Sequence, residues 1–162
     1  MEALQALKAI ESSEAYNEWR KSNAEAYLTS MFAMFSGSEE RKWLVTYYDR
    51  AQERMTTFSA DGQRSSEEPF SRDRKIPELK LEDVKVDDEK AIKAANGAFR
   101  KNYPGEAVQK AVMVLQSLDS KPLWNVTLIA TTMKVINIKI AASTGAVLDH
   151  SMSSIADFIQ KK

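Results

Sequence analysis

The alternation of apolar and polar positions is clearest in residues 123–149, LWNVTLIATTMKVINIKIAASTGAVLD. Apolar residues alternate with polar ones from Trp124 to Leu128 and again from Ile136 to Ile140. A period of two with β-branched and aromatic residues is typical of half-buried strands. Gly145 then supplies a turn, because glycine adopts positive φ without steric cost. We predict an antiparallel meander with one apolar face that other segments must cover.

The N-terminal segment has a different period. Apolar residues from Leu4 to Ile10 recur at helical spacing, and apolar and aromatic residues continue to Phe35 without a proline. We predict helix over residues 1–35, with Ser13 among the residues that cap a second segment and Gly37 just past the end.

Shorter patterns follow this segment. The alternation of Trp43, Val45 and Tyr47 predicts a strand over residues 42–48, with a returning strand over residues 54–60 and a turn at Gly62. Residues 63–80 are charged, contain two prolines and show no sustained period, which predicts a connector.

The third helix begins at a recognisable cap. Asp87 is a good N-cap, and an apolar stripe from Ala91 to Phe99 follows it at helical spacing. Pro104 disfavours helical geometry in the residue before it and ends the helix. A strand over residues 107–115 and a short closing helix from Ser154 complete the prediction.

Two parts of the chain resemble each other. The sequence WLVT at Trp43 resembles WNVT at Trp124, and Gly62 follows its tryptophan at nearly the same spacing as Gly145. Each copy follows a predicted helix, so we predict a duplicated α-β-meander unit. The expected organisation is a divergent helix plus hairpin over residues 1–66, a connector over 67–80, and the second unit over 81–162.

The second unit resembles a PepSY-type domain. The resemblance is carried by the lead-in LEDV at Leu81, the helix start DDEKAIKAA at Asp87, the W-x-V strand at Trp124, and the segment IKIAASTGAV ending at Val147. Small residues stand where the family usually has an acidic residue before the T-G pair. The resemblance implies an α+β fold, PepSY-like or cystatin-like, with helices packed on curved antiparallel sheets. It also implies a non-catalytic regulatory or inhibitory role, often outside the cytoplasm.

Composition limits the function classes. Cysteine is absent, which excludes disulfides and thiolate metal sites, and 23 basic residues balance 23 acidic ones, which argues against nucleic-acid binding. No apolar run is long enough for a transmembrane segment. The N-terminus does not resemble a secretory leader, so we expect a cytoplasmic protein if the sequence is complete and an extracytoplasmic one if a leader was removed.

Candidate chemistry is sparse. His150 beside Asp149 could form an acid–base pair, although a surface histidine at a strand end explains it better. The acidic groups at residues 39–40, 67–68 and 87–89 lack the spacing of a calcium loop and fit helix capping and solvation better. We expect no enzyme activity, catalytic residue, cofactor or metal.

Aromatic residues suggest an interface instead. Tyr47 and Tyr48 are adjacent, so one ring must lie on each face of their strand. We take the tandem tyrosines, the two repeat tryptophans and the two turn glycines as candidate structural or interface residues: Trp43, Tyr47, Tyr48, Trp124, Gly62 and Gly145. A further set is either an adaptable partner groove or simple core: Trp19, Tyr27, Met31, Phe32, Met34 and Phe35.

Three functions remain open on the sequence alone. The first is a binding or regulatory module for a protein or peptide. The second is a small-ligand carrier, or an enzyme, that uses the cone between helix and sheet. The third is self-association through strand edges, such as a homodimer, with Lys110, Lys134 and Lys139 as edge-protecting charges.

Overall fold

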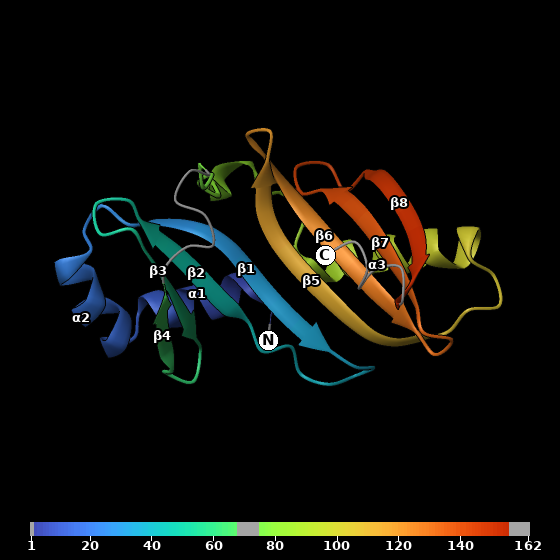
Figure 1. Cartoon of the computed structure of the whole chain (residues 1–162), viewed down its shortest axis with the longest axis horizontal. Coiled ribbons are helices and arrows are strands. Elements are labelled where there is room, and N and C mark those ends of the chain that lie inside the picture. The colour runs from blue at the N-terminus through green and yellow to red at the C-terminus, as the bar shows by residue number, and fades with distance from the viewer. Residues whose placement is uncertain (1, 68–74, 156–162) are drawn as a thin grey trace.

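A single antiparallel sheet organises the protein. The computed structural model describes residues 2–67 and 75–155, and within them eight strands pair in the order β4-β3-β2-β1-β5-β6-β7-β8 (Figure 1). Each neighbouring pair is antiparallel. The strands are β1 (Tyr27–Phe35), β2 (Leu44–Asp49), β3 (Arg54–Ser59), β4 (Arg64–Glu67), β5 (Val108–Leu118), β6 (Lys121–Ala130), β7 (Lys134–Ala141) and β8 (Val147–Ser154).

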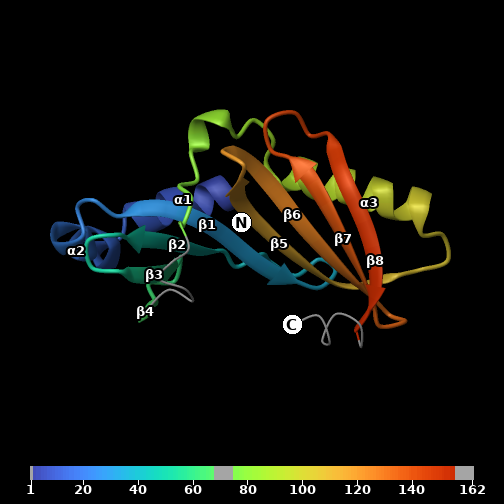
Figure 2. The ribbon, with the colours of Figure 1, turned by 45° about the horizontal axis from the view of Figure 1, so that its top comes forward.

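The described helices all lie on one face of this sheet. Helices α1 (Ala3–Glu11) and α2 (Glu14–Ser22) lie behind β1–β4, and α3 (Asp88–Asn102) lies behind β6–β8 (Figure 2). A short 3₁₀ turn, η1 (Leu81–Asp83), precedes α3. The strands form two meanders, β1–β4 and β5–β8. Residues on the helix-side face form one continuous buried cluster across both meanders. We call the opposite side the open face.

The predicted fold class is wrong. Among the described residues 42% lie in strands and 25% in helices, so the protein is mainly one antiparallel sheet. This overturns the predicted α+β class, PepSY-like or cystatin-like, with helices packed on curved antiparallel sheets. The two meanders share one sheet because β1 pairs with β5 from Ser30↔Gln116 to Phe35↔Ala111.

The error originates in one segment. Residues 27–35 were predicted to be helical, but Tyr27–Phe35 forms β1, the strand that joins the two halves. Met31, Ala33 and Phe35 are buried on the helix-side face, while Phe32 and Met34 lie on the open face. A central strand with apolar residues on both faces appears as a continuous run, which periodicity alone does not distinguish from a buried helix.

Several local predictions are confirmed. The Ser13 side chain accepts a hydrogen bond from Tyr16 N at the start of α2, and the Asp87 side chain accepts one from Lys90 N at the start of α3. The connector prediction missed β4, whose four residues are all exposed and so show no alternation. The predicted closing helix falls almost entirely on residues 156–162, outside the described residues.

Candidate functional site

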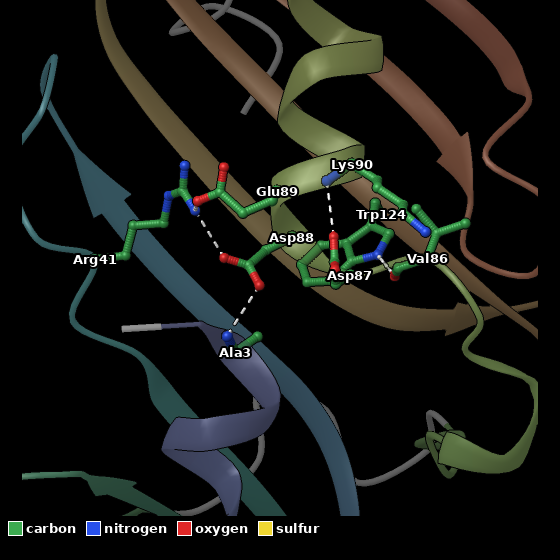
Figure 3. Close-up of polar contacts among 8 residues, drawn as sticks. All are labelled: Ala3, Arg41, Val86, Asp87, Asp88, Glu89, Lys90 and Trp124. Carbon is green, nitrogen blue, oxygen red and sulfur yellow. Dashed lines mark hydrogen bonds and ion pairs between the residues drawn. The ribbon is translucent and has the colours of Figure 1, made fainter.

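The two candidate tryptophans meet in the core between the halves. Trp43 lies immediately before β2 and Trp124 lies on β6, and each is 1% exposed. Their ring centroids are 5.9 Å apart at 63°, an edge-to-face contact. Trp124 Nε1 donates a hydrogen bond of 2.9 Å to Val86 O, just before α3 (Figure 3). The pair therefore links the loop before β2, the strand β6 and the approach to α3.

A buried carboxylate lies two residues after Val86, whose carbonyl accepts the Trp124 hydrogen bond. Asp88, in the first turn of α3, has a side chain that is 1% exposed. Its Oδ1 accepts a 3.0 Å hydrogen bond from Ala3 N, and its Oδ2 lies 2.8 Å from Arg41 Nη1 (Figure 3). The same Arg41 nitrogen lies 2.6 Å from Glu89 Oε1. We call Ala3, Arg41, Asp88 and Glu89 the Asp88 clasp.

The clasp joins three segments that are remote in sequence. Glu2 gives α1 no side-chain cap, so Asp88 accepts from an N–H at the positive end of that helix in place of a local cap. The Arg41 side chain is 15% exposed, and its guanidinium lies 4.8 Å from the Phe35 ring centroid. Every polar atom of the buried carboxylate is satisfied, which is the condition for a buried ion pair to be tolerated.

The sequence did not reveal this clasp. Asp88 was assigned only to the favourable charge at the start of its helix, and Arg41 was not selected. The two residues lie 47 positions apart, and neither belongs to a motif. Only the close approach of the two meanders reveals the pair.

Tyr47 belongs to a second buried cluster of aromatic side chains. Its ring packs with Tyr16, Trp19 and Phe58 at centroid distances of 5.4–6.0 Å. Its hydroxyl donates to Glu11 Oε1 at 3.0 Å. Burial, reinforced by the nearby Glu11 charge, raises the pKa of Tyr47 above its ordinary value, so the phenol stays protonated.

Tyr48 lies on the opposite face, as the period of a strand requires. It is half-buried, and its ring meets Tyr27 edge to face at 5.7 Å. Tyr27 in turn donates its hydroxyl proton to Ile76 O at 2.5 Å. Tyr48 is therefore the tandem tyrosine that borders the open face.

The two candidate glycines are turn residues. Gly62 has φ +93° between β3 and β4, and Gly145 has φ +84° between β7 and β8. Gly145 N donates to Ala141 O at 2.8 Å, and a Cβ at this position would lie 3.5 Å from Val86 Cγ2. Positive φ accounts for glycine at both positions without a binding role.

The histidine is not paired with its neighbouring aspartate. His150 lies opposite Ile138 and Asp149 lies opposite Lys139, so the two side chains lie on different faces of β8. His150 Nδ1 instead lies 2.8 Å from the Tyr103 hydroxyl. Among the described residues no group of three or more His, Asp or Glu side chains could hold a metal ion.

The open face carries an apolar patch at its centre. Strand register places Phe32 opposite both Leu44 and Val114, and places Met34 opposite Val112. Met34 is 48% exposed and Leu44 39% exposed, while the other three are half-buried. We call these five residues on β1, β2 and β5 the open-face patch.

Polar side chains border the patch on both sides. On β2 and β3, the Thr46 and Thr57 hydroxyls lie 2.8 Å apart. On β6 and β7, Asn137 Nδ2 donates to Asn125 Oδ1 at 2.6 Å and to Thr127 Oγ1 at 3.1 Å. An apolar centre with a hydrogen-bonded polar border is the usual composition of a protein-binding surface.

Comparisons with known proteins give a fold relationship. No protein-family model matches the chain, and no curated protein matches it. One crystal structure from Clostridium difficile 630, described as a "putative lipoprotein", has a similar fold. Its TM-score is 0.57 at 14% sequence identity, covering 86% of this chain and 91% of that one. Of the described helices, none is long and apolar enough to cross a membrane.

Proposed function

We propose that this protein is a non-catalytic binding module that docks a protein or peptide partner on the open face of its sheet. The observation that supports this proposal is the open-face patch. Exposed hydrophobic side chains scattered singly need no explanation, but a contiguous group with a polar border is a feature of interaction surfaces. Helices fill one face of the sheet, and the patch occupies the centre of the other.

Buried side chains fill the space between the helices and the sheet, which favours a binding surface on the open face over a ligand pocket in that space. The interval between helices and sheet contains fully buried large side chains such as Trp43, Trp124 and Ile138. A small-ligand site in a cone between helix and sheet would need that volume, together with converging polar groups. The alternative of a ligand carrier or an enzyme therefore has less support than docking on the sheet.

The PepSY resemblance and the internal repeat stay predictions. Their support is positional: Trp43 precedes β2 and Trp124 lies on β6, and these strands hold the second place in their respective meanders. A regulatory role is the function that the resemblance implies, and it agrees with a docking surface that carries no reactive groups.

Charge placed in the patch is expected to abolish docking. The double variant Met34→Lys with Leu44→Lys puts two cations into the apolar centre, and we expect partner affinity to fall at least about tenfold. Both side chains are already partly exposed, so the free energy of unfolding should change by about 0.5 kcal/mol or less per site. Affinity capture from the source organism's extract, quantified by mass spectrometry, measures the effect.

Leu118→Lys is the matched control. Leu118 is 48% exposed, like Met34, but lies at the β5–β6 end of the sheet away from the patch. The wild type and Leu118→Lys should retain the same partner, and the double patch variant should lose it. Equal retention by all three proteins would show that the open face does not carry the function.

A further inference from the structure

Strand β8 forms one edge of the sheet. Among the described strands only β7 pairs with it, and it lies at the far side of the sheet from β4 (Figures 1 and 2). All of its residues are exposed except Ser153, which is half-buried. Such an edge presents backbone N–H and C=O groups that can pair with another strand.

The alternation of hydrogen bonds between β7 and β8 identifies which backbone N–H and C=O groups of β8 point away from β7. Ile155 N donates to Met133 O, one residue beyond the Lys134↔Ser154 pair. Hydrogen-bonded and non-hydrogen-bonded pairs alternate along an antiparallel ladder. His150 and Met152 therefore belong to non-hydrogen-bonded pairs with β7, and their N–H and C=O groups point to the outer edge.

The side chains of β8 do not protect this edge. The strand contains one carboxylate, Asp149, and neither lysine nor proline. Val147, Leu148 and Met152 are exposed at 42%, 61% and 45%. By contrast, β4 is four residues long with Arg64 and Glu67 at its ends. Short length and charge are the usual protection of an edge strand, and only β4 has both.

The lysines expected to protect edges are elsewhere. Lys110 lies on β5, and Lys134 and Lys139 lie on β7. In the sheet order each of these strands has a neighbouring strand on both sides, and β8 itself contains no lysine. The three lysines therefore do not prevent pairing at β8.

We propose that β8 pairs antiparallel with β8 of a second copy of this chain, around a twofold axis at Ser151. This register places the outward backbone groups of His150 against those of Met152 from the second copy, giving four hydrogen bonds between the chains. Ser151 meets its own symmetry mate, where two hydroxyls can bond. The result is one continuous sheet that spans two copies.

Self-pairing in this register is electrostatically compatible. Asp149 lies opposite Ser153 of the second copy, and His150 lies opposite Met152, so no like charges face each other. Two small serines occupy the axis, where a large or charged side chain would meet its own copy. A self-complementary strand and a twofold axis are the requirements of an isologous dimer, the commonest oligomer of soluble proteins.

The test is a charge exchange at the axis. Ser151→Lys brings two lysines into direct opposition, and Ser151→Glu brings two glutamates together. Each variant alone should raise the dimer Kd about fivefold or more, and an equimolar mixture should restore association as a heterodimer. Ser65→Lys on β4 is the matched control and should leave the dimer unchanged. Sedimentation velocity over a concentration series measures each Kd.

A backbone variant tests the same edge independently. Met152→Pro removes an N–H that points away from β7, so the monomer ladder stays intact. It removes two of the four bonds between chains and should raise Kd about a hundredfold. Far-ultraviolet circular dichroism shows whether the proline variant is folded. If it is not folded, Ser151→Lys remains as the test of this edge.

Three outcomes overturn the proposal. If the wild-type chain remains monomeric over the concentration series, β8 does not form an interface between copies. A dimer that neither Ser151→Lys nor Met152→Pro weakens must use another surface. A dimer strengthened by Ser151→Lys has a different register, because a lysine opposite Asp149 is attractive. None of these results bears on the open-face patch, whose own variants are tested separately.

Discussion

Replacing Asp88 with alanine is expected to lower the free energy of unfolding by about 3–5 kcal/mol. The carboxylate is buried and accepts from both Ala3 N and Arg41. Its removal leaves a guanidinium that is 15% exposed without its buried partner, and it leaves the first N–H of α1 without an acceptor. Because folded domains have a total stability of roughly 5–15 kcal/mol, this loss should be evident in equilibrium urea unfolding.

Glu89→Ala is the matched control for this prediction. Glu89 contacts the same Arg41 nitrogen from the same helical turn, but its side chain is 48% exposed. Solvent-exposed ion pairs contribute about 0–1 kcal/mol, so this variant should be nearly as stable as the wild type. Equal losses for the two variants would contradict the idea that burial of Asp88 makes the clasp important.

Trp124→Ala is expected to be comparably destabilising, by about 3–5 kcal/mol. The side chain is 1% exposed, and its removal leaves a cavity beside Trp43 as well as an unpaired Val86 carbonyl. Trp43→Ala should also be strongly destabilising. Because the two rings contact each other, the double variant should lose about 0.5–1.5 kcal/mol less than the sum of the single losses.

The double-mutant cycle can also contradict the contact between the two indole rings. Strictly additive losses would mean that the two indoles do not touch in solution. If the cycle cannot be completed because the double alanine variant is unfolded, leucine at both positions removes the aromatic rings, keeps more of the core volume than alanine and allows the same comparison. Equilibrium unfolding with urea measures all four proteins.

The sequence predicted the C-terminal meander well, and in the N-terminal half it predicted α1, α2, β2 and β3 but missed β1 and β4. Strands β6 and β7 are buried on the helix side and partly exposed on the other, so their residues alternate with the expected period. Strand β1 has Phe32 and Met34 on its open face as well as Met31, Ala33 and Phe35 buried on the helix side, so its residues do not alternate between apolar and polar. The resulting apolar run was interpreted as helix, which changed both the fold class and the position of the junction.

The candidate site was predictable only in part. Trp43 and Trp124 were selected from a local similarity, and the structure places them in contact. The Asp88 clasp and the open-face patch depend on pairing between segments about 50 to 80 residues apart. A period along one strand predicts which residues share a face of that strand. It does not predict which strand will be its neighbour, so the patch across β2, β1 and β5 required the sheet order.

The pairing of β1 with β5 is the central claim, because it creates both the single sheet and the open-face patch. The chain has no cysteine, so introduced pairs report on geometry without background. Met34 and Val112 are directly opposite on the open face, which places their Cα atoms within the range that a disulfide can bridge. Gln116 is on the same face of β5, four residues and about 13 Å further along the strand.

The most direct measurement is therefore the rate of disulfide formation under mild oxidation. We expect Met34→Cys with Val112→Cys to crosslink rapidly within the chain, and Met34→Cys with Gln116→Cys to crosslink slowly or not at all. Rapid crosslinking of the second pair, or no crosslinking of the first, would contradict the β1–β5 junction and with it the surface on which the proposed function depends.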